Sequence, residues 1–234
     1  MKRFWDDVTV AEAEEGLAVL LDGRPVRLPG GAPIRPRSRR LADAVAEEWR
    51  AAGGSKGGEF GMHHIPLTRL VGTAAERIAP DPAPMVEGLA AYGGTDLLCY
   101  RADDHRLAAI QATEWDPWLE WSAEVLGARL VTATGIIHVE QPEAARVALL
   151  KAVAALEPEQ LAALGVLVPA LGSLVLSLAV VRDALTPEEA HRLSTVDERY
   201  QEEFWGADPE TEARRTRIGA EVLEAGRLLA LLRP

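Results

Sequence analysis

Three carboxylates are the residues whose types and spacing could support acid–base chemistry. Asp116 and Glu120 are spaced for one face of a helix, and Asp96 follows a Gly-Gly-Thr stretch earlier in the chain. A hydrolase would need two carboxylates in different environments across a cleft, whereas carboxylates in a row on one helix face usually form a solvated stripe. A hydrolase of unknown class, using Asp96 with Asp116 or Glu120, is therefore the alternative hypothesis.

Other patterns that resemble catalytic or ligand-binding motifs lack the context that their chemistry needs. Gly53–Gly57 matches the nucleophile-elbow pattern, but it follows a predicted helix and not a strand. His63 and His64 have no cysteine or further histidine at a metal-binding spacing. The sequence has neither a phosphate loop nor a dinucleotide-binding glycine motif. We expect no metal, no cofactor, no nucleotide and no catalytic residue.

Aromatic and acidic residues on two predicted helices are better suited to binding a protein. Trp115, Trp118 and Trp121 recur every three residues, so they cannot all face one core, and aromatic residues are favoured at interface centres. On the predicted helix 186–204, an inward stripe of Leu193, Val196, Tyr200 and Phe204 would turn Glu198 and Glu202 to solvent. This acidic face is either solvated or a contact for a basic partner. The candidate partner-binding residues are Asp116, Trp118, Trp121, Asp197, Glu198 and Glu202.

Composition limits the classes of partner and compartment. The 234 residues are 48% hydrophobic and carry a formal net charge of −11. Residues 1–84 contain 12 basic and 12 acidic side chains, and residues 85–234 contain 13 and 24, so the second part carries the whole imbalance. Such a surface disfavours nucleic acid. The single cysteine, Cys99, and the absence of a signal or transit segment lead us to expect a monomeric protein of the bacterial cytoplasm.

The N-terminal part predicts a small α+β domain. Strands at 8–11, 17–21 and 25–28 are expected, with a tight hairpin turn at Asp22-Gly23. Ser38 is suited to cap a helix that reaches about residue 52, whose buried stripe includes Trp49. A second helix is expected over 66–79. The prolines at 80, 82 and 84 place a domain boundary between 1–83 and 84–234.

The second part predicts a mostly helical domain. The expected helices are 84–92, 105–126, 142–156, 158–182, 186–204 and 208–232, with short extended pieces at 97–100, 129–131 and 136–139. Asp116-Pro117 predicts a kink or a fresh helix start. The stretch from Leu161 to Val181 has no charged residue, and its glycines, proline and serines favour a buried helix over a membrane span. We expect no insertion into a membrane.

An ordered set of motifs resembles the Atp12 chaperone family over most of the chain. The matching stretches are Leu21–Val26, Glu48-Trp49, Pro66–Leu70, Tyr92–Arg101, Trp115–Pro117, Leu171–Leu178, Leu193–Glu198, Tyr200-Gln201 and Trp205-Gly206. Two positions depart from the family pattern: Gly72 stands where many relatives have Asn, and the glycine-rich stretch 53–61 is unusual.

This resemblance implies a function as well as a fold. The implied fold is a small N-terminal α+β domain followed by an orthogonal helical bundle. The implied function is an assembly chaperone that binds the free alpha subunit of F-type ATP synthase and shields its interface until it pairs with beta. Among the family's sensitive positions, Glu198 corresponds to a client contact and Trp49 to a tryptophan of the N-terminal domain. The place of Trp49 in the stripe with Leu41 and Val45 indicates that it acts through packing. A generic acidic interaction module stays open as another alternative.

Overall fold

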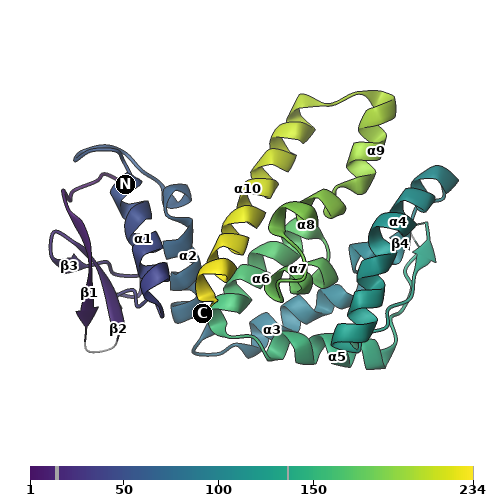
Figure 1. Ribbon diagram of the computed structural model, residues 1–234, viewed down its shortest axis with the longest axis horizontal. Coiled ribbons are helices and arrows are strands. Elements are labelled where there is room, and N and C mark those ends of the chain that lie inside the picture. Colours follow the sequence, from purple (N-terminus) through teal and green to yellow (C-terminus); the bar gives the residue numbers. More distant parts are fainter. Residues whose placement is uncertain (14–15, 136, 234) are drawn as a thin grey trace. The chain divides into compact units, whose positions relative to one another are not determined.

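The computed structural model describes residues 1–13, 16–135 and 137–233. The backbone divides into two compact units, Met1–Pro82 with Arg227–Pro234, and Ala83–Gly226. The first unit contains a small antiparallel sheet with helices, and the second is helical apart from one short strand pair (Figure 1). The expected α+β class, with a hairpin-containing N-terminal part and a helical remainder, is confirmed.

The N-terminal sheet contains three strands in the order β1-β2-β3. These are β1 Val8–Ala13, β2 Gly16–Leu21 and β3 Arg24–Pro25. Asp22 and Gly23 have φ values of 47° and 77°, so the predicted two-residue hairpin turn is confirmed. The Asp22 carboxylate also accepts the backbone N–H of Asp7 at 2.8 Å. This side chain therefore joins the turn to the segment that leads into β1.

Helix α1, Arg39–Ala51, covers this sheet by packing against β1 and β2. The predicted cap is confirmed, because the Ser38 side chain accepts the Leu41 N–H at 3.1 Å. Leu41 and Val45 are fully buried and Trp49 is 9% exposed, so the predicted apolar stripe faces the core. The Trp49 indole packs edge-on against Trp5, with ring centroids 5.1 Å apart.

Helix α2, Pro66–Thr73, is capped by a side chain from another helix. The buried Glu48 carboxylate accepts the N–H groups of Leu67 at 2.6 Å and Thr68 at 3.0 Å, which are orphan donors of the first helical turn. Burial raises the pKa of Glu48, although the hydrogen bonds from α2 oppose that shift. The neighbouring Trp49 donates its indole N–H to the Thr68 hydroxyl at 2.9 Å. Trp49 and Glu48 therefore join α1 to α2.

The glycine-rich stretch after α1 forms a hydrogen-bonded cradle for Arg3. The Arg3 guanidinium donates to the carbonyl groups of Arg50 at 2.6 Å and Gly54 at 2.9 Å. Gly58 must be glycine here, because a Cβ at that position would lie 1.8 Å from the Gly53 carbonyl oxygen. The stretch thus closes over the last carbonyls of α1, where a cation is favourable.

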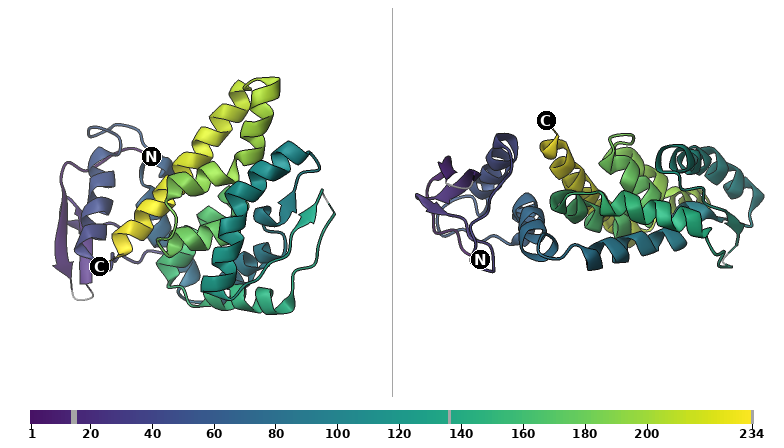
Figure 2. Two further views of the ribbon diagram at one scale, coloured as in Figure 1. Left: turned by 45° about the vertical axis from the view of Figure 1, so that its right-hand side comes forward. Right: turned by 90° about the horizontal axis from the view of Figure 1, so that it is seen from below.

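The helices of the second unit follow the sequence with two additional breaks. They are α3 Ala83–Ala90, α4 His105–Trp121, α5 Glu143–Ala154, α6 Pro158–Leu171, α7 Leu174–Val181, α8 Pro187–Ser194, α9 Val196–Trp205 and α10 Pro209–Leu232, of which the residues from Arg227 on belong to the first unit. A π-helical turn, Ser122–Leu126, continues α4. In the first unit, a similar turn, Ala74–Ile78, continues α2. The views in Figure 2 show α9 and the first part of α10 side by side as a helical hairpin.

The centre of this unit is formed by α6 and α7, which α3, α4 and α8 contact. The uncharged stretch from Leu161 to Val181 is largely buried. The single helix expected over 158–182 is divided at Gly172, which has φ 63° and ends α6. Ser173 then caps α7 by accepting the Leu176 N–H at 3.1 Å. None of the helices within the described ranges combines the length and apolar character that crossing a bilayer requires.

Three further expectations are corrected. Of the kink or fresh helix start predicted at Asp116-Pro117, the fresh start does not occur, because α4 runs through Pro117. The helix expected over 186–204 is divided at Thr195. Residues 97–99 form a 3-10 turn, and the strand pair is β4 Tyr100–Arg101 with β5 Ala133–Thr134 in parallel. No strand occurs at 129–131, and Ile136, where the third extended piece was expected to begin, lies outside the described residues.

Candidate functional site

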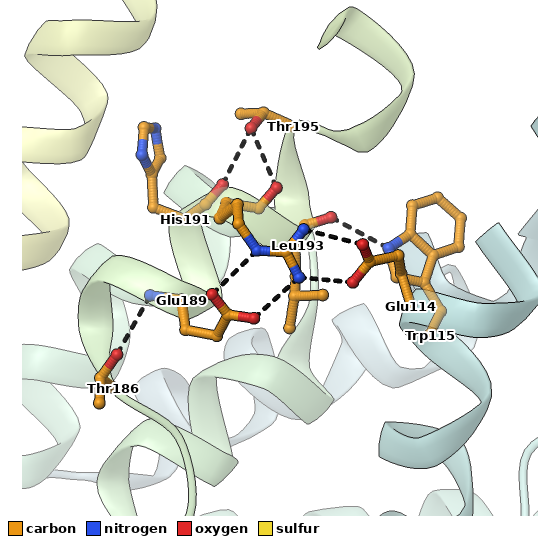
Figure 3. Close-up of polar contacts among 8 residues, drawn as sticks. Glu114, Trp115, Thr186, Glu189, His191, Leu193 and Thr195 are labelled. Carbon is orange, nitrogen blue, oxygen red and sulfur yellow. Dashed lines mark hydrogen bonds and ion pairs between the residues drawn. The ribbon is translucent and has the colours of Figure 1, made fainter. Parts of the chain in front are cut away.

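The candidate site is built on α9 and on the helices that hold it, beginning with α8. Arg192 of α8 donates to Glu189 on its own helix at 2.9 Å and to Glu114 of α4 at 2.9 Å. Hydrogen bonds from Arg192 lower the pKa of the Glu114 carboxyl, so the pair is ionised at neutral pH. The Trp115 indole donates to the Leu193 carbonyl at 3.0 Å. Figure 3 shows the contact between the two helices, with Glu114 and Trp115 of α4 on one side and Glu189 and Leu193 of α8 on the other.

Thr195 marks the point where α8 ends and α9 begins. Its hydroxyl lies 3.1 Å from the carbonyl oxygens of both His191 and Arg192, which are end carbonyls of α8 (Figure 3). The backbone of Thr195, with φ −111° and ψ 18°, is not helical. This break shifts the helical phase, so the side chains of α9 do not continue the pattern of α8. The predicted apolar stripe, which assumed one continuous helix across Thr195, therefore assigns the wrong residues to the buried and exposed faces of α9.

Two carboxylates of α9 face α10 and not open solvent, which corrects the orientation that we expected. Glu198 pairs with Arg214 at 2.6 Å, and Glu202 pairs with Arg215. The Glu198 side chain is 36% exposed and that of Glu202 is 21% exposed. Conversely, Phe204, which was expected in the core, is 56% exposed. Both acidic side chains remain partly accessible, although each already has a cationic partner.

A hollow of about 430 Å³ lies beside the first of these ion pairs. Glu198, Arg214, Arg215 and His191 are among its lining residues. The His191 ring packs on Gly219 of α10, where a Cβ would lie 2.9 Å from its Cε1 atom. Burial, together with the charge of Arg215, lowers the pKa of His191, so the imidazole is neutral at pH 7.

Asp197 faces α4 instead of α10. Its carboxylate accepts the Gln111 side-chain N–H at 2.7 Å, and the Gln111 oxygen accepts the Ala102 N–H at 2.8 Å. On the same helix, Asp116 accepts from Arg101 at 2.6 Å. The structure therefore places Asp197 and Asp116 in polar contacts around β4 and α4, while Glu198 and Glu202 lie on another face of α9.

Comparisons with known proteins agree on the relatives of this chain. Residues 2–123 match the model of the ATP12 chaperone protein family. The crystal structure of Atp12 from Paracoccus denitrificans has a TM-score of 0.92 and 42% sequence identity, covering 99% of this chain and 98% of that one. A chaperone candidate from Agrobacterium tumefaciens has a TM-score of 0.91 and 38% identity, with 99% and 86% covered. The mitochondrial protein atp12 of Schizosaccharomyces pombe is 25% identical over 218 residues, 88% of this chain and 74% of the relative.

The chain belongs to the ATP12 chaperone family. The family that the sequence motifs indicated is thereby confirmed. The names of the family and of the Agrobacterium relative describe chaperones, which points to a non-enzymatic protein and away from a hydrolase.

Asp96 has a structural role in this member of the ATP12 family. Its carboxylate is fully buried and accepts the N–H groups of Leu98 and Val175, each at 3.0 Å. Burial raises its pKa, and the backbone donors at the start of α7 counter that shift. Asp116 is instead exposed and paired with Arg101. A shared water-activating role for the two is therefore unsupported. Across the described ranges, no cluster of three metal-binding side chains occurs either.

The remaining candidates, Trp118 and Trp121, lie near the C-terminal end of α4. Their rings meet edge-on at 6.2 Å and both side chains are half-buried, whereas Trp115 is fully buried. Helix α4 runs antiparallel to α8 and α9, since Asp104 contacts Tyr200 while Trp115 contacts Leu193. Along α4, the tryptophan pair therefore follows the residues that contact α8 and lies away from those that contact α9. The predicted partner-binding residues form two separate groups.

Sequence reasoning missed the residues that fix these groups in place. Arg192, Gln111 and Arg214 make the contacts that hold α8 and α9 to α4 and α10. Each is a long polar side chain whose partner on the neighbouring helix lies 16 or more positions away, so no local pattern shows the pairing. The break at Thr195 had a signal, since a Ser-Thr pair inside an apolar-periodic helix favours local side-chain hydrogen bonds.

Proposed function

We propose that this ATP12-family protein is an assembly chaperone that binds the free alpha subunit of F-type ATP synthase. It shields the alpha subunit's mating interface until the beta subunit takes its place. The observation that carries the proposal is the acidic α9, held between α4 and α10 in a chain of this family. Because the second part of the chain holds the entire net charge of −11, it favours a client with a basic surface.

The physical logic needs binding and no bond-making step. An unpaired subunit exposes an obligate interface, which is large, apolar and prone to self-association. A chaperone that covers this surface lowers the free concentration of the aggregating species. The true partner then displaces it by mass action, so release requires no nucleotide.

For the contact surface, we propose the two groups that the sequence indicated. The first is the α9 group of Asp197, Glu198 and Glu202, in which Glu198 combines partial exposure with a position beside the hollow. The second is the half-buried pair Trp118 and Trp121, which offers aromatic area at low entropic cost. Asp116 lies between these groups on α4 and is exposed.

The test is capture of isolated alpha subunit by the purified protein. We expect one chaperone per alpha subunit by light scattering after size exclusion, suppressed aggregation of alpha, release on addition of beta, and no nucleotide consumption. We further propose that the chaperone is a monomer and acts in the cytoplasm. Unchanged aggregation of alpha without a complex would contradict the function. Recovery of a different basic protein as the dominant partner from native cells would favour the generic interaction module.

A further inference from the structure

The outer end of the α9–α10 hairpin presents two aromatic side chains to solvent. Trp205 is 87% exposed and Phe204 is 56% exposed, and Trp205 is the most exposed large hydrophobic residue in the described part of the chain. Single exposed apolar residues are common on protein surfaces. Two adjacent aromatic residues, of which one is a tryptophan with almost its whole ring in water, form a patch that favours burial on binding.

This tip is ordered by contacts on its inner side. The Phe204 ring lies 5.0 Å from Tyr200 and 5.6 Å from the Arg106 guanidinium. Gly206, with φ 80°, ends α9, and its N–H donates to the Glu202 carbonyl at 3.0 Å. The ion pair between Glu202 and Arg215 is about four-fifths buried on both sides and ties the last turn of α9 to α10. The exposed Trp205 is thus presented from a fixed backbone, which reduces the entropy lost on binding.

The charge around the tip indicates what would cover it. Residues 203–212 contain four acidic side chains and no basic one, and with Arg106, whose guanidinium lies against Phe204, the local net charge is −3. The acidic residues, all exposed, are Glu203, Asp208, Glu210 and Glu212. A second copy of this tip would bring like charges together, which is unfavourable. A partner with an apolar pocket and lysine or arginine side chains at its rim is complementary in both respects.

We propose that Trp205, with Phe204 beside it, is the aromatic anchor of the client interface and inserts into an apolar pocket of the client that has a basic rim. This inference rests on the proposed function and adds to it the anchor and the chemistry of the client's pocket. It also gives the α9–α10 ion pairs a role, since they hold the anchor in position.

The experiment measures the affinity for isolated alpha subunit by isothermal titration calorimetry. Trp205→Ala is expected to weaken binding by about 30-fold or more, the effect of removing an interface hot spot. Leu223→Ala is the matched control, because Leu223 is a 42% exposed hydrophobic residue on α10, and its affinity should stay within about threefold of the wild type. Melting curves check that both variants remain folded.

A footprint locates the contact without removing the anchor. Ala207 is exposed, while Cys99 is fully buried, so Ala207→Cys gives one accessible thiol. Client binding should protect this thiol from a maleimide, and higher salt should weaken binding because the rim is charged.

Wild-type affinity in Trp205→Ala, or an unprotected thiol in the complex, would overturn the anchor while leaving the proposed function intact. A wild-type dimer that Trp205→Ala dissolves would assign the tip to self-association and also overturn the proposal. Failure of the wild type to bind alpha subunit would overturn both the anchor and the function.

Discussion

Charge reversal at Glu198 separates a client contact from a purely structural role. The Glu198–Arg214 pair is 36% and 52% exposed, and a pair this accessible contributes about 0–1 kcal/mol. Glu198→Lys replaces this attraction with a repulsion of similar size. We therefore expect the free energy of unfolding to fall by about 2 kcal/mol at most, a melting shift of no more than about 4–8 °C.

The loss of client binding should be much larger if Glu198 touches a basic group on the alpha subunit. Truncating or reversing one member of a desolvated interfacial charge pair costs about 2–5 kcal/mol, which is about 30-fold or more in affinity. Calorimetric titration with alpha subunit measures this effect, and thermal melting measures the stability. Glu221→Lys, a charge reversal at an exposed position of α10, is the matched control.

A swapped pair completes the design. Glu198→Lys combined with Arg214→Glu restores the ion pair between α9 and α10 with its polarity reversed, so stability should return to the wild-type value. Client affinity should stay low, because the negative charge has moved to α10. If the swap restores client affinity, Glu198 affects binding only by holding α9 to α10 and does not contact the client itself. If Glu198→Lys binds as tightly as wild type, Glu198 is no contact at all.

Three further outcomes are expected in the N-terminal unit and the core. Trp49→Ala should lower the urea-unfolding free energy by about 3–5 kcal/mol. Trp49→Phe keeps one aromatic ring in the core but loses the rest of the indole and the bond to Thr68, so it should cost less, about 1–3 kcal/mol; equal costs would contradict the packing role. The raised pKa of Glu48 means that its folded form holds a proton above the ordinary 4.5, so stability present below that pH is lost as pH rises through the raised pKa. In urea titrations, the free energy of unfolding of the wild type should rise relative to that of Glu48→Gln as the pH is lowered from 7 to 4.5. A difference between the two proteins that stays constant with pH would refute this. Burial raises the pKa of the Cys99 thiol to about 12, so Ellman's reagent should react only after unfolding, and rapid native labelling would contradict it.

Local rules predicted the elements whose signals are contained in a few residues. Ser38 caps α1 through its own side chain, and Asp22-Gly23 can adopt the positive φ values of the hairpin. The class of the fold followed from these signals together with the helical periodicity of the second part. The family followed from the order of the motifs, which composition alone does not give.

Long-range pairing was beyond the same rules. In the stretch that became α6 and α7, nearly every residue is apolar, so periodicity cannot show where one helix ends. The Gly172-Ser173 pair was the available signal, because glycine ends a helix and serine caps the next. For α9, extending the helical periodicity of α8 past Thr195 led us to predict that Glu198 points to solvent. In the structure Glu198 pairs with Arg214 of α10, which lies 16 residues further along the chain.

The N-terminal segment also constrains when the first unit can form during translation. Arg3 is bound by carbonyls near Gly54, and the indole of Trp5 donates to the Trp49 carbonyl at 3.1 Å. Trp49 in turn needs Thr68. At about 5–20 residues per second, the ribosome takes several seconds to supply these partners. Until then the first strands have no complete core against which to pack, so a nascent chain stalled before Thr68 should be sensitive to proteases. Full resistance should appear only after residues 227–234, which belong to the same unit, have been added.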